Sequence, residues 1–98
     1  MLTKTLAWEV GPLGIRVNAL APGVIETNFS RHNFVDEDGN VDPDRLAKYR
    51  KRFSAMAPLQ RVGSAQDVAD SILFLVSERA SFMTGQILRP NGGVAMPW

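Results

Sequence analysis

The stretch IRVNALAPGVIET, residues 15–27, decides the fold. Every second residue at its start is apolar, which is the period of a β-strand with two different faces. The pattern predicts a strand over residues 15–21 that ends at Pro22-Gly23. A plain turn accounts for the Pro-Gly pair but leaves unexplained the lone Thr27, four residues after the glycine. A cofactor site would use both features, so the rest of the chain has to supply its partners.

The residues before this strand have helical spacing. Four apolar residues fall on one stripe of a helix: Leu2, Leu6, Val10 and Leu13. Gly11-Pro12 ends that helix, and no capping residue precedes Leu2, so we expect the chain to enter the helix part-way along. Trp8 lies off the stripe, where it is either a partly exposed aromatic residue or a contact between subunits.

Between residues 26 and 58 the regular apolar pattern is lost. This middle segment contains an acidic loop at residues 36–39 and then Asp42 and Asp44, which open a short helix. Basic residues gather toward the end of that helix, so its charges complement the helix dipole. Without aromatic interleaving or overall basicity, we interpret the basic residues of 48–52 as a solvated helix face rather than a nucleic-acid site.

The last third of the chain predicts a long helix and a short strand. Ser64 and Asp67 have the spacing of a capping box at the start of the helix. Its apolar face consists of Val68, Ile72, Leu75 and Val76. A strand over residues 86–89 follows, and Pro90 restricts it to an edge or terminal position in a sheet.

The order helix, strand, long segment, helix, strand indicates an α/β fold with parallel strands joined by a right-handed crossover. Two strands do not make a stable sheet of this kind. We therefore expect the carboxyl-terminal part of a doubly wound, Rossmann-like parallel sheet that is incomplete on its own. Residues 1–98 form a single partial domain with three segments, at 1–25, 26–58 and 59–98.

Composition excludes several classes of protein. Of the 98 residues, 45% are hydrophobic and 21% charged, which is typical of a globular domain rather than a disordered chain. A net charge of +1 gives no support to nucleic-acid or membrane-surface binding. The sequence has no cysteine, no signal peptide and no membrane-spanning run, so we expect a cytoplasmic protein.

Candidate catalytic and metal sites fail on spacing. The position four residues after Tyr49 is Phe53, so no Tyr-x-x-x-Lys pair is present. The alternating acidic residues from Asp36 onward lack the glycine and glutamate positions of a calcium loop, and they are interpreted as a flexible polar loop. The lone His32 has no clustered ligands and is interpreted as a surface residue. We assign no catalytic and no metal-binding residue within the sequence.

Residues 6–27, LAWEVGPLGIRVNALAPGVIET, and residues 58–93, from PLQRVG to RPNGG, together resemble the short-chain dehydrogenase/reductase family. Several linked motifs occur in the right order: GIRVN, the Pro-Gly loop, Thr-Gly-Gln and the final Asn-Gly-Gly. The motifs PGVIET and NGG look most like the 3-oxoacyl-carrier-protein reductase branch, although many members carry Asp-Gly-Gly where this chain has Asn91-Gly92-Gly93.

The resemblance implies an NAD(P)-dependent oxidoreductase that transfers hydride between a nicotinamide cofactor, NAD or NADP, and an alcohol or ketone. By resemblance, Pro22 and Gly23 let the backbone approach the nicotinamide, Ile25 offers backbone groups to its carboxamide, and the Thr27 hydroxyl bonds the carboxamide or a phosphate. The family's glycine-rich loop, catalytic serine and Tyr-x-x-x-Lys are expected upstream, so we expect the chain to be inactive alone.

The family keeps its substrate lid at residues 26–58, which implies that Phe29 and Phe34 face the substrate. The match weakens there, and the segment is longer than in compact carrier-protein reductases, which places that substrate in doubt. The resemblance also implies a homo-oligomer, a dimer or tetramer, because relatives use the helix of Trp8 and the last helix as interfaces. Two alternatives stay open: a non-catalytic, self-associating remnant and a small-molecule-binding module.

Overall fold

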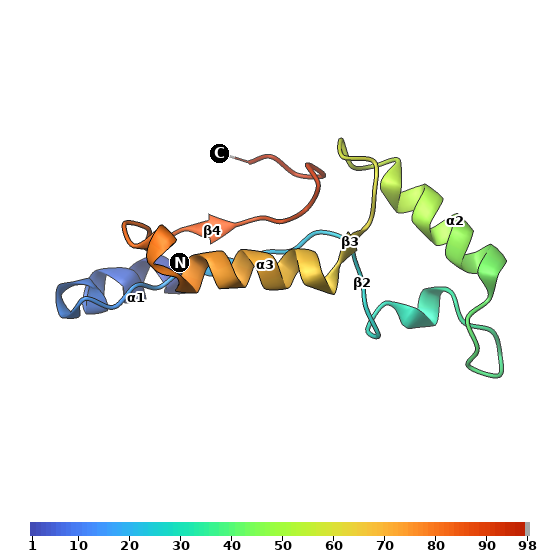
Figure 1. Ribbon diagram of the computed structural model, residues 1–98, viewed down its shortest axis with the longest axis horizontal. Helices are drawn as coiled ribbons and strands as arrows, with labels where there is room; N and C mark the ends of the chain where they lie inside the picture. Colours follow the sequence, from blue (N-terminus) through green and yellow to red (C-terminus); the bar gives the residue numbers. More distant parts are fainter. Residues whose placement is uncertain (98) are drawn as a thin grey trace.

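The computed structural model describes residues 1–97, and it confirms the predicted parallel α/β class. The chain is elongated, with extents of 53 × 28 × 24 Å, and α1, α3 and β4 lie in one half while α2 stands apart (Figure 1). The helix α1 (Leu2–Val10) and the short 3-10 helix η1 (Gly11–Leu13) end at Gly14, whose left-handed φ of 77° is available to glycine.

The strand β1 (Ala19–Leu20) pairs in parallel with β4 (Ile87–Leu88), in the register Ala19 to Ile87. Both strands are shorter than predicted. Before β1, the Thr84 side chain accepts from the backbone N–H of Val17 at 3.0 Å, so a hydroxyl occupies a place that a ladder carbonyl would take. The pairing is parallel, as predicted, but regular ladder geometry is confined to two residues on each strand.

A second parallel pair was not predicted. The strand β2 (Ile25–Glu26) pairs with β3 (Gly63–Ser64), and the helix α3 (Ala65–Val76) follows β3 directly. Ser64 caps α3, and the predicted capping box with Asp67 is present in both directions. One glycine-dependent contact explains why the pattern gave no strand signal here: a Cβ on Gly63 would lie 2.5 Å from Ile25 Cδ1.

The middle segment folds into elements of its own. The 3-10 helix η2 (Arg31–Asn33) leads into a hairpin closed by an antiparallel bridge between Val35 and Val41, and then into α2 (Pro43–Ser54). Asp36 Oδ1 accepts from the backbone N–H groups of Asp38 and Asn40 at 2.9 and 3.0 Å. The acidic loop is therefore a hydrogen-bonded hairpin turn rather than an unstructured linker.

The buried apolar side chains are few. They are Ala7, Phe34, Tyr49, Ala57, Leu75 and Ala80. The predicted apolar faces of α1 and α3 lie largely in the open, since Leu2 is 77% exposed and Val76 70% exposed. Most of the apolar area of these two helix faces is therefore not packed against other residues, which agrees with a fold that is incomplete within these residues.

Arg16 joins the segment before β1 to the end of α3. Its Nη1 donates to the carbonyl oxygen of Leu75 at 2.8 Å, and its Nη2 donates to that of Ser77 at 3.3 Å. These carbonyls belong to the last turn and the C-cap of α3, where a helix leaves its acceptors without partners. A cation at this end also complements the negative pole of the helix dipole. None of the helices within residues 1–97 is both long and apolar enough to cross a bilayer.

Candidate functional site

Residues 22–27, hereafter the Pro-Gly loop, follow β1 at the edge where both β1 and β4 end. Gly23 brings this loop against the segment that follows β4: its N–H donates to the carbonyl oxygen of Pro90 at 3.2 Å. A Cβ on Gly23 would lie 2.6 Å from Asn91 Cβ, closer than any side chain tolerates. Glycine is therefore required here by packing within the chain. Pro22 lies exposed beside it.

Ile25 presents its backbone away from β3. The N–H of Gly63 donates to the carbonyl oxygen of Val24 at 2.9 Å, and Ile25 is the residue paired with Gly63. In a parallel ladder Gly63 therefore bonds the residues on either side of Ile25, and not Ile25 itself. The two polar groups of the central residue then point to the opposite side of its strand. Within residues 1–97 the Ile25 N–H makes no hydrogen bond. A backbone donor is thus available on the free side of β2.

Ser30 fixes the end of the Pro-Gly loop. Its Oγ accepts from the Thr27 N–H at 3.0 Å and lies within donating distance of two carbonyl oxygens, those of Thr27 at 3.0 Å and Ile25 at 3.3 Å. The Thr27 hydroxyl, in contrast, has no hydrogen-bond partner among residues 1–97, where only the N–H and the carbonyl oxygen of this residue are bonded. The Ser30 hydroxyl shapes the loop, and the Thr27 hydroxyl is unpaired within the described residues.

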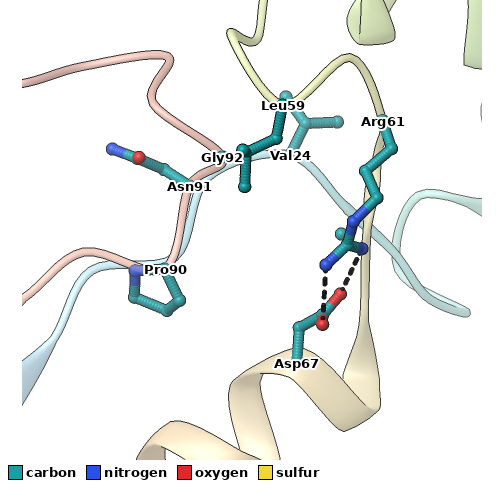
Figure 2. A pocket seen from close by; sticks show the side chains of 8 residues that line it. Val24, Leu59, Arg61, Asp67, Pro90, Asn91 and Gly92 are labelled. Atoms are coloured by element: carbon teal, nitrogen blue, oxygen red, sulfur yellow. Dashed lines mark hydrogen bonds and ion pairs between the residues drawn. The ribbon is translucent and has the colours of Figure 1, made fainter.

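A pocket of about 210 Å³ opens at the carboxyl ends of the strands, the edge at which doubly wound sheets bind ligands (Figure 2). It is lined by Val24, Leu59, Arg61, Gly63, Asp67, Pro90, Asn91 and Gly92. In Figure 2 the Arg61 side chain extends to Asp67 in the first turn of α3, with Nη1 to Oδ2 at 2.7 Å and Nη2 to Oδ1 at 3.0 Å.

Asp67 is the most strongly perturbed carboxyl group in the described residues. Hydrogen bonds from the Arg61 guanidinium, and then from the Ser64 N–H and hydroxyl, hold the pKa of Asp67 well below its usual range. The group is therefore a permanent anion at physiological pH, committed to Arg61 and to the start of α3. It joins the α3 start to β3, and through β3 to the strand of Ile25.

Thr27 lines a different, shallower pocket of about 240 Å³. Its other lining residues are Glu26, Asn28, Arg31, Phe34, Val41 and Leu46. Phe34 is only 5% exposed and packs on Tyr49 with ring centroids 5.4 Å apart, whereas Phe29 is 90% exposed. The structure brings Thr27 and Phe34 to one pocket and leaves Phe29 in the open.

Arg50 corrects one interpretation made from the sequence. It does not belong to a purely solvated helix face, because it reaches Glu26 in the Pro-Gly loop with Nη2 to Oε1 at 2.8 Å and Nε to Oε2 at 3.0 Å. The hydrogen bonds from Arg50 lower the pKa of Glu26 against the opposing effect of partial burial. Residues 26 and 50 carried no spacing signal, since they lie 24 positions apart in different elements.

Tyr49 and the metal-ligating side chains form no second site within the described residues. The ring of Tyr49 is buried between Phe34 and Phe53, with centroid distances of 5.4 and 4.9 Å. Its role is therefore packing. No cluster of three or more metal-ligating side chains occurs within residues 1–97. Sequence reasoning also missed Ser30, which shapes the Pro-Gly loop; a serine three residues after Thr27 was the available signal. It named Asn91 only as part of the final Asn-Gly-Gly motif and did not predict its contact with Gly23.

Comparison with known proteins shows extensive similarity. The model of the protein family described as Enoyl-(Acyl carrier protein) reductase matches residues 1–95. A 3-oxoacyl-[acyl-carrier-protein] reductase from Buchnera aphidicola is 39% identical over 93 residues, which are 95% of this chain and 33% of that protein. A peroxisomal 2,4-dienoyl-CoA reductase from Saccharomyces cerevisiae is 42% identical over 95 residues, which are 95% of this chain and 28% of that protein.

The fold has close counterparts among solved structures. A C-terminal deletion mutant of aldohexose dehydrogenase from Thermoplasma acidophilum aligns with a TM-score of 0.81 and 38% identity, covering 95% of this chain and 40% of that one. The chain spans about a third of the length of the curated relatives it matches. The names of these three proteins refer to three different substrates, so similarity alone does not select a substrate.

Proposed function

Because this chain belongs to the short-chain dehydrogenase/reductase family, we propose that it is the carboxyl-terminal part of an NAD(P)-dependent oxidoreductase. The reaction is hydride transfer between a nicotinamide cofactor and an alcohol or ketone. Its relatives in that family are reductases and dehydrogenases by name. The cofactor is NAD or NADP, and this part of the chain does not discriminate between them.

The observation that carries the proposal is the pair of free donors in the Pro-Gly loop. The Ile25 N–H and the Thr27 hydroxyl both lack partners among residues 1–97, although Ser30 bonds the Thr27 N–H and the carbonyl oxygens of Ile25 and Thr27 on either side of them. A carboxamide has one carbonyl acceptor and one NH₂ donor. A backbone N–H and a hydroxyl, which both donates and accepts, fit that group.

In this proposal Pro22, Gly23, Ile25 and Thr27 bind the nicotinamide end of the cofactor. The bound nicotinamide supplies or accepts the hydride. The chain's own contribution is orientation: Ile25 and Thr27 hold the carboxamide so that one face of the ring meets the substrate, and Ser30 keeps both residues in place. When the nicotinamide ring is held in the orientation that the transition state needs, these binding contacts raise the rate of hydride transfer.

Residues 1–98 include neither the family's Tyr-x-x-x-Lys nor its glycine-rich loop. The acid that protonates a carbonyl oxygen and the cradle for the pyrophosphate therefore have to come from elsewhere in the protein. We propose that the 98-residue chain alone has no dehydrogenase turnover and binds nicotinamide cofactors only weakly.

The middle segment is proposed as the substrate lid, with Phe29 and Phe34 as its aromatic residues. Exposure supports a direct substrate contact for Phe29, while burial against Tyr49 makes Phe34 a support for the lid's shape. The exposed apolar faces of α1 and α3 support a homo-oligomer, a dimer or tetramer. The same faces would also serve a non-catalytic, self-associating protein, and the lid pocket a binding module.

The test uses the complete polypeptide that carries these residues. Titration with NADH and with NADPH, followed by steady-state kinetics, compares the wild type with Thr27→Val and Thr27→Ser. Thr27→Val keeps the shape and removes the hydroxyl bond, so it should cost about 1–2 kcal/mol in cofactor binding or in kcat/KM. Thr27→Ser keeps the hydroxyl and should retain most of the activity. Unchanged kinetics in Thr27→Val, or turnover by the 98-residue chain alone, would refute the proposal.

A further inference from the structure

One ion pair joins α2 to the Pro-Gly loop. Arg50, in the third turn of α2, makes two parallel hydrogen bonds to Glu26, which lies between Ile25 and Thr27 in the sequence. This fork-to-fork geometry fixes both distance and orientation, which a single-point contact does not. The anchor of α2 thus sits on the short stretch that carries both free donors.

Other contacts of α2 stay within the middle segment. Tyr49 packs on Phe34, and Arg45 Nη1 donates to the carbonyl oxygen of Val35 at 2.6 Å. Among residues 1–97, no other side-chain hydrogen bond or ion pair joins α2 to a residue outside 27–62. Figure 1 shows α2 standing away from α1, α3 and β4. The position of this helix relative to the loop is therefore set by the Glu26–Arg50 pair and by the chain connections at its ends.

The pair is exposed enough to open. The side chain of Arg50 is 55% accessible and that of Glu26 is 29% accessible, so water and salt compete with both hydrogen bonds. A contact of this strength holds a segment in place without locking it. It suits a covering element that has to open for substrate and cofactor exchange.

We propose that Glu26 and Arg50 are positioning residues that couple the closure of α2 to the placement of Ile25 and Thr27 at the nicotinamide site. The inference rests on the proposed function, since it assigns the pair to the same loop. When the pair is formed, Glu26 is held against α2, and this fixes the residue that stands between Ile25 and Thr27. When it opens, both the helix and the loop gain freedom.

The experiment uses the complete polypeptide with four variants: Glu26→Gln, Arg50→Gln, the charge-reversed double variant Glu26→Arg/Arg50→Glu, and Lys51→Gln. The last removes a positive charge from the next position of the same helix, where no ion pair is recorded. Two quantities are measured: the Kd for NADH and NADPH, and the amide hydrogen exchange of residues 43–54 with and without cofactor.

We expect Glu26→Gln and Arg50→Gln each to raise the cofactor Kd by about 2- to 5-fold and to speed exchange in α2 by a similar factor. The double variant should restore both, and Lys51→Gln should change neither. Restoration shows that both effects come from the pairing of the two charges and not from either side chain alone. The change in Kd, measured beside the exchange of α2, separates a positioning role from a purely structural one.

Failure of each proposal has its own signature. If the wild type binds cofactor and Thr27→Val weakens it, but the pair variants change neither quantity, the coupling is wrong and the nicotinamide site stands. If Arg50→Gln speeds exchange in α2 but leaves the Kd unchanged, the pair is only structural and the coupling is again wrong. If the wild type binds neither NADH nor NADPH, the proposed function is wrong and the coupling falls with it.

Discussion

The two parts of this molecule hold themselves together by opposite means. The crossover frame, made of α1, β1, α3 and β4, is joined by contacts between residues far apart in sequence, such as Arg16 with Leu75, while its apolar faces lie open. The middle segment, residues 26–58, buries Phe34 and Tyr49 in its own aromatic cluster, to which the half-buried Phe53 also belongs. The frame is therefore arranged correctly but unfinished, whereas the middle segment is locally complete. The crossover frame therefore needs other segments or chains to cover its apolar faces, and the middle segment does not.

The largest expected effect is on association. The 98-residue chain alone should not behave as a stable monomer, because Leu2, Leu13 and Val76 leave large apolar areas in water. The unpaired outer side of β1 adds an edge that invites pairing with another chain. Sedimentation velocity at micromolar concentration is the measurement. A compact monomer with cooperative melting would show that the frame is self-sufficient after all.

The second prediction removes the core of the middle segment. Phe34→Ala should destabilise the middle segment by about 3 kcal/mol, because a buried ring would leave a cavity against Tyr49. Phe29→Ala, at a ring that is 90% exposed, is the matched control and should cost almost nothing. In the complete polypeptide, amide exchange should rise in residues 31–54 and stay unchanged in α3. Equal exchange increases in both regions would mean that they unfold as one unit.

The third prediction concerns the contact at which the two regions meet. Gly93 follows β4 with a φ of +95°, and a Cβ there would lie 2.7 Å from Pro58 Cγ, at the end of the middle segment. Gly93→Ala should lower the free energy of unfolding by about 2 kcal/mol through backbone strain and this collision. Gly11→Ala is the control, since its Cβ would meet open space at an ordinary φ of −54°. Urea unfolding of the complete polypeptide compares them; equal midpoints would refute the contact.

The smallest effect is expected at the start of α3. Ser64→Ala removes the N-cap acceptor and should lower the free energy of unfolding by about 1 kcal/mol.

The neighbouring Asp67 adds a pH dependence to the stability of this helix start. Folding lowers the pKa of Asp67, so its stabilisation is present above the pKa of the unfolded chain and is lost as the pH falls toward the pKa of the folded state. The stability difference between the wild type and Asp67→Asn should be constant above about pH 5 and shrink below about pH 4. A difference that grows on acidification would contradict the assignment.

Local sequence predicted the parts of this fold whose contacts are local. The capping box needs only Ser64 and Asp67, and the end of the first helix needs only Gly11-Pro12, so both are visible in the spacing. The β2–β3 pair was missed because two-residue strands carry no period, and because Gly63 is selected by the approach of Ile25. The Glu26–Arg50 pair was missed for the same kind of reason: it depends on how a helix is placed.

The Pro-Gly loop shows the same limit within the candidate site. The motif pointed to Gly23, Ile25 and Thr27, and the structure explains two of them by contacts that the motif does not contain. Gly23 is fixed by Asn91, and the direction of Ile25 is fixed by Gly63. A resemblance could nominate these residues. Their mutual arrangement follows from segments more than 30 positions away, which no local pattern encodes.

Arg16 has a consequence for how this protein is made. Its guanidinium binds the carbonyl oxygens of residues 75 and 77, so about sixty further residues must leave the ribosome after Arg16 before the contact can form. Contacts between residues so far apart in sequence slow folding, because the entropy of closing the intervening loop is lost before the contact stabilises the fold. The middle segment closes its own contacts, such as Arg45 with Val35, within ten positions. We expect residues 31–54 to be ordered on the nascent chain while Arg16 is still unpaired, so the part proposed to cover the site forms before the site itself.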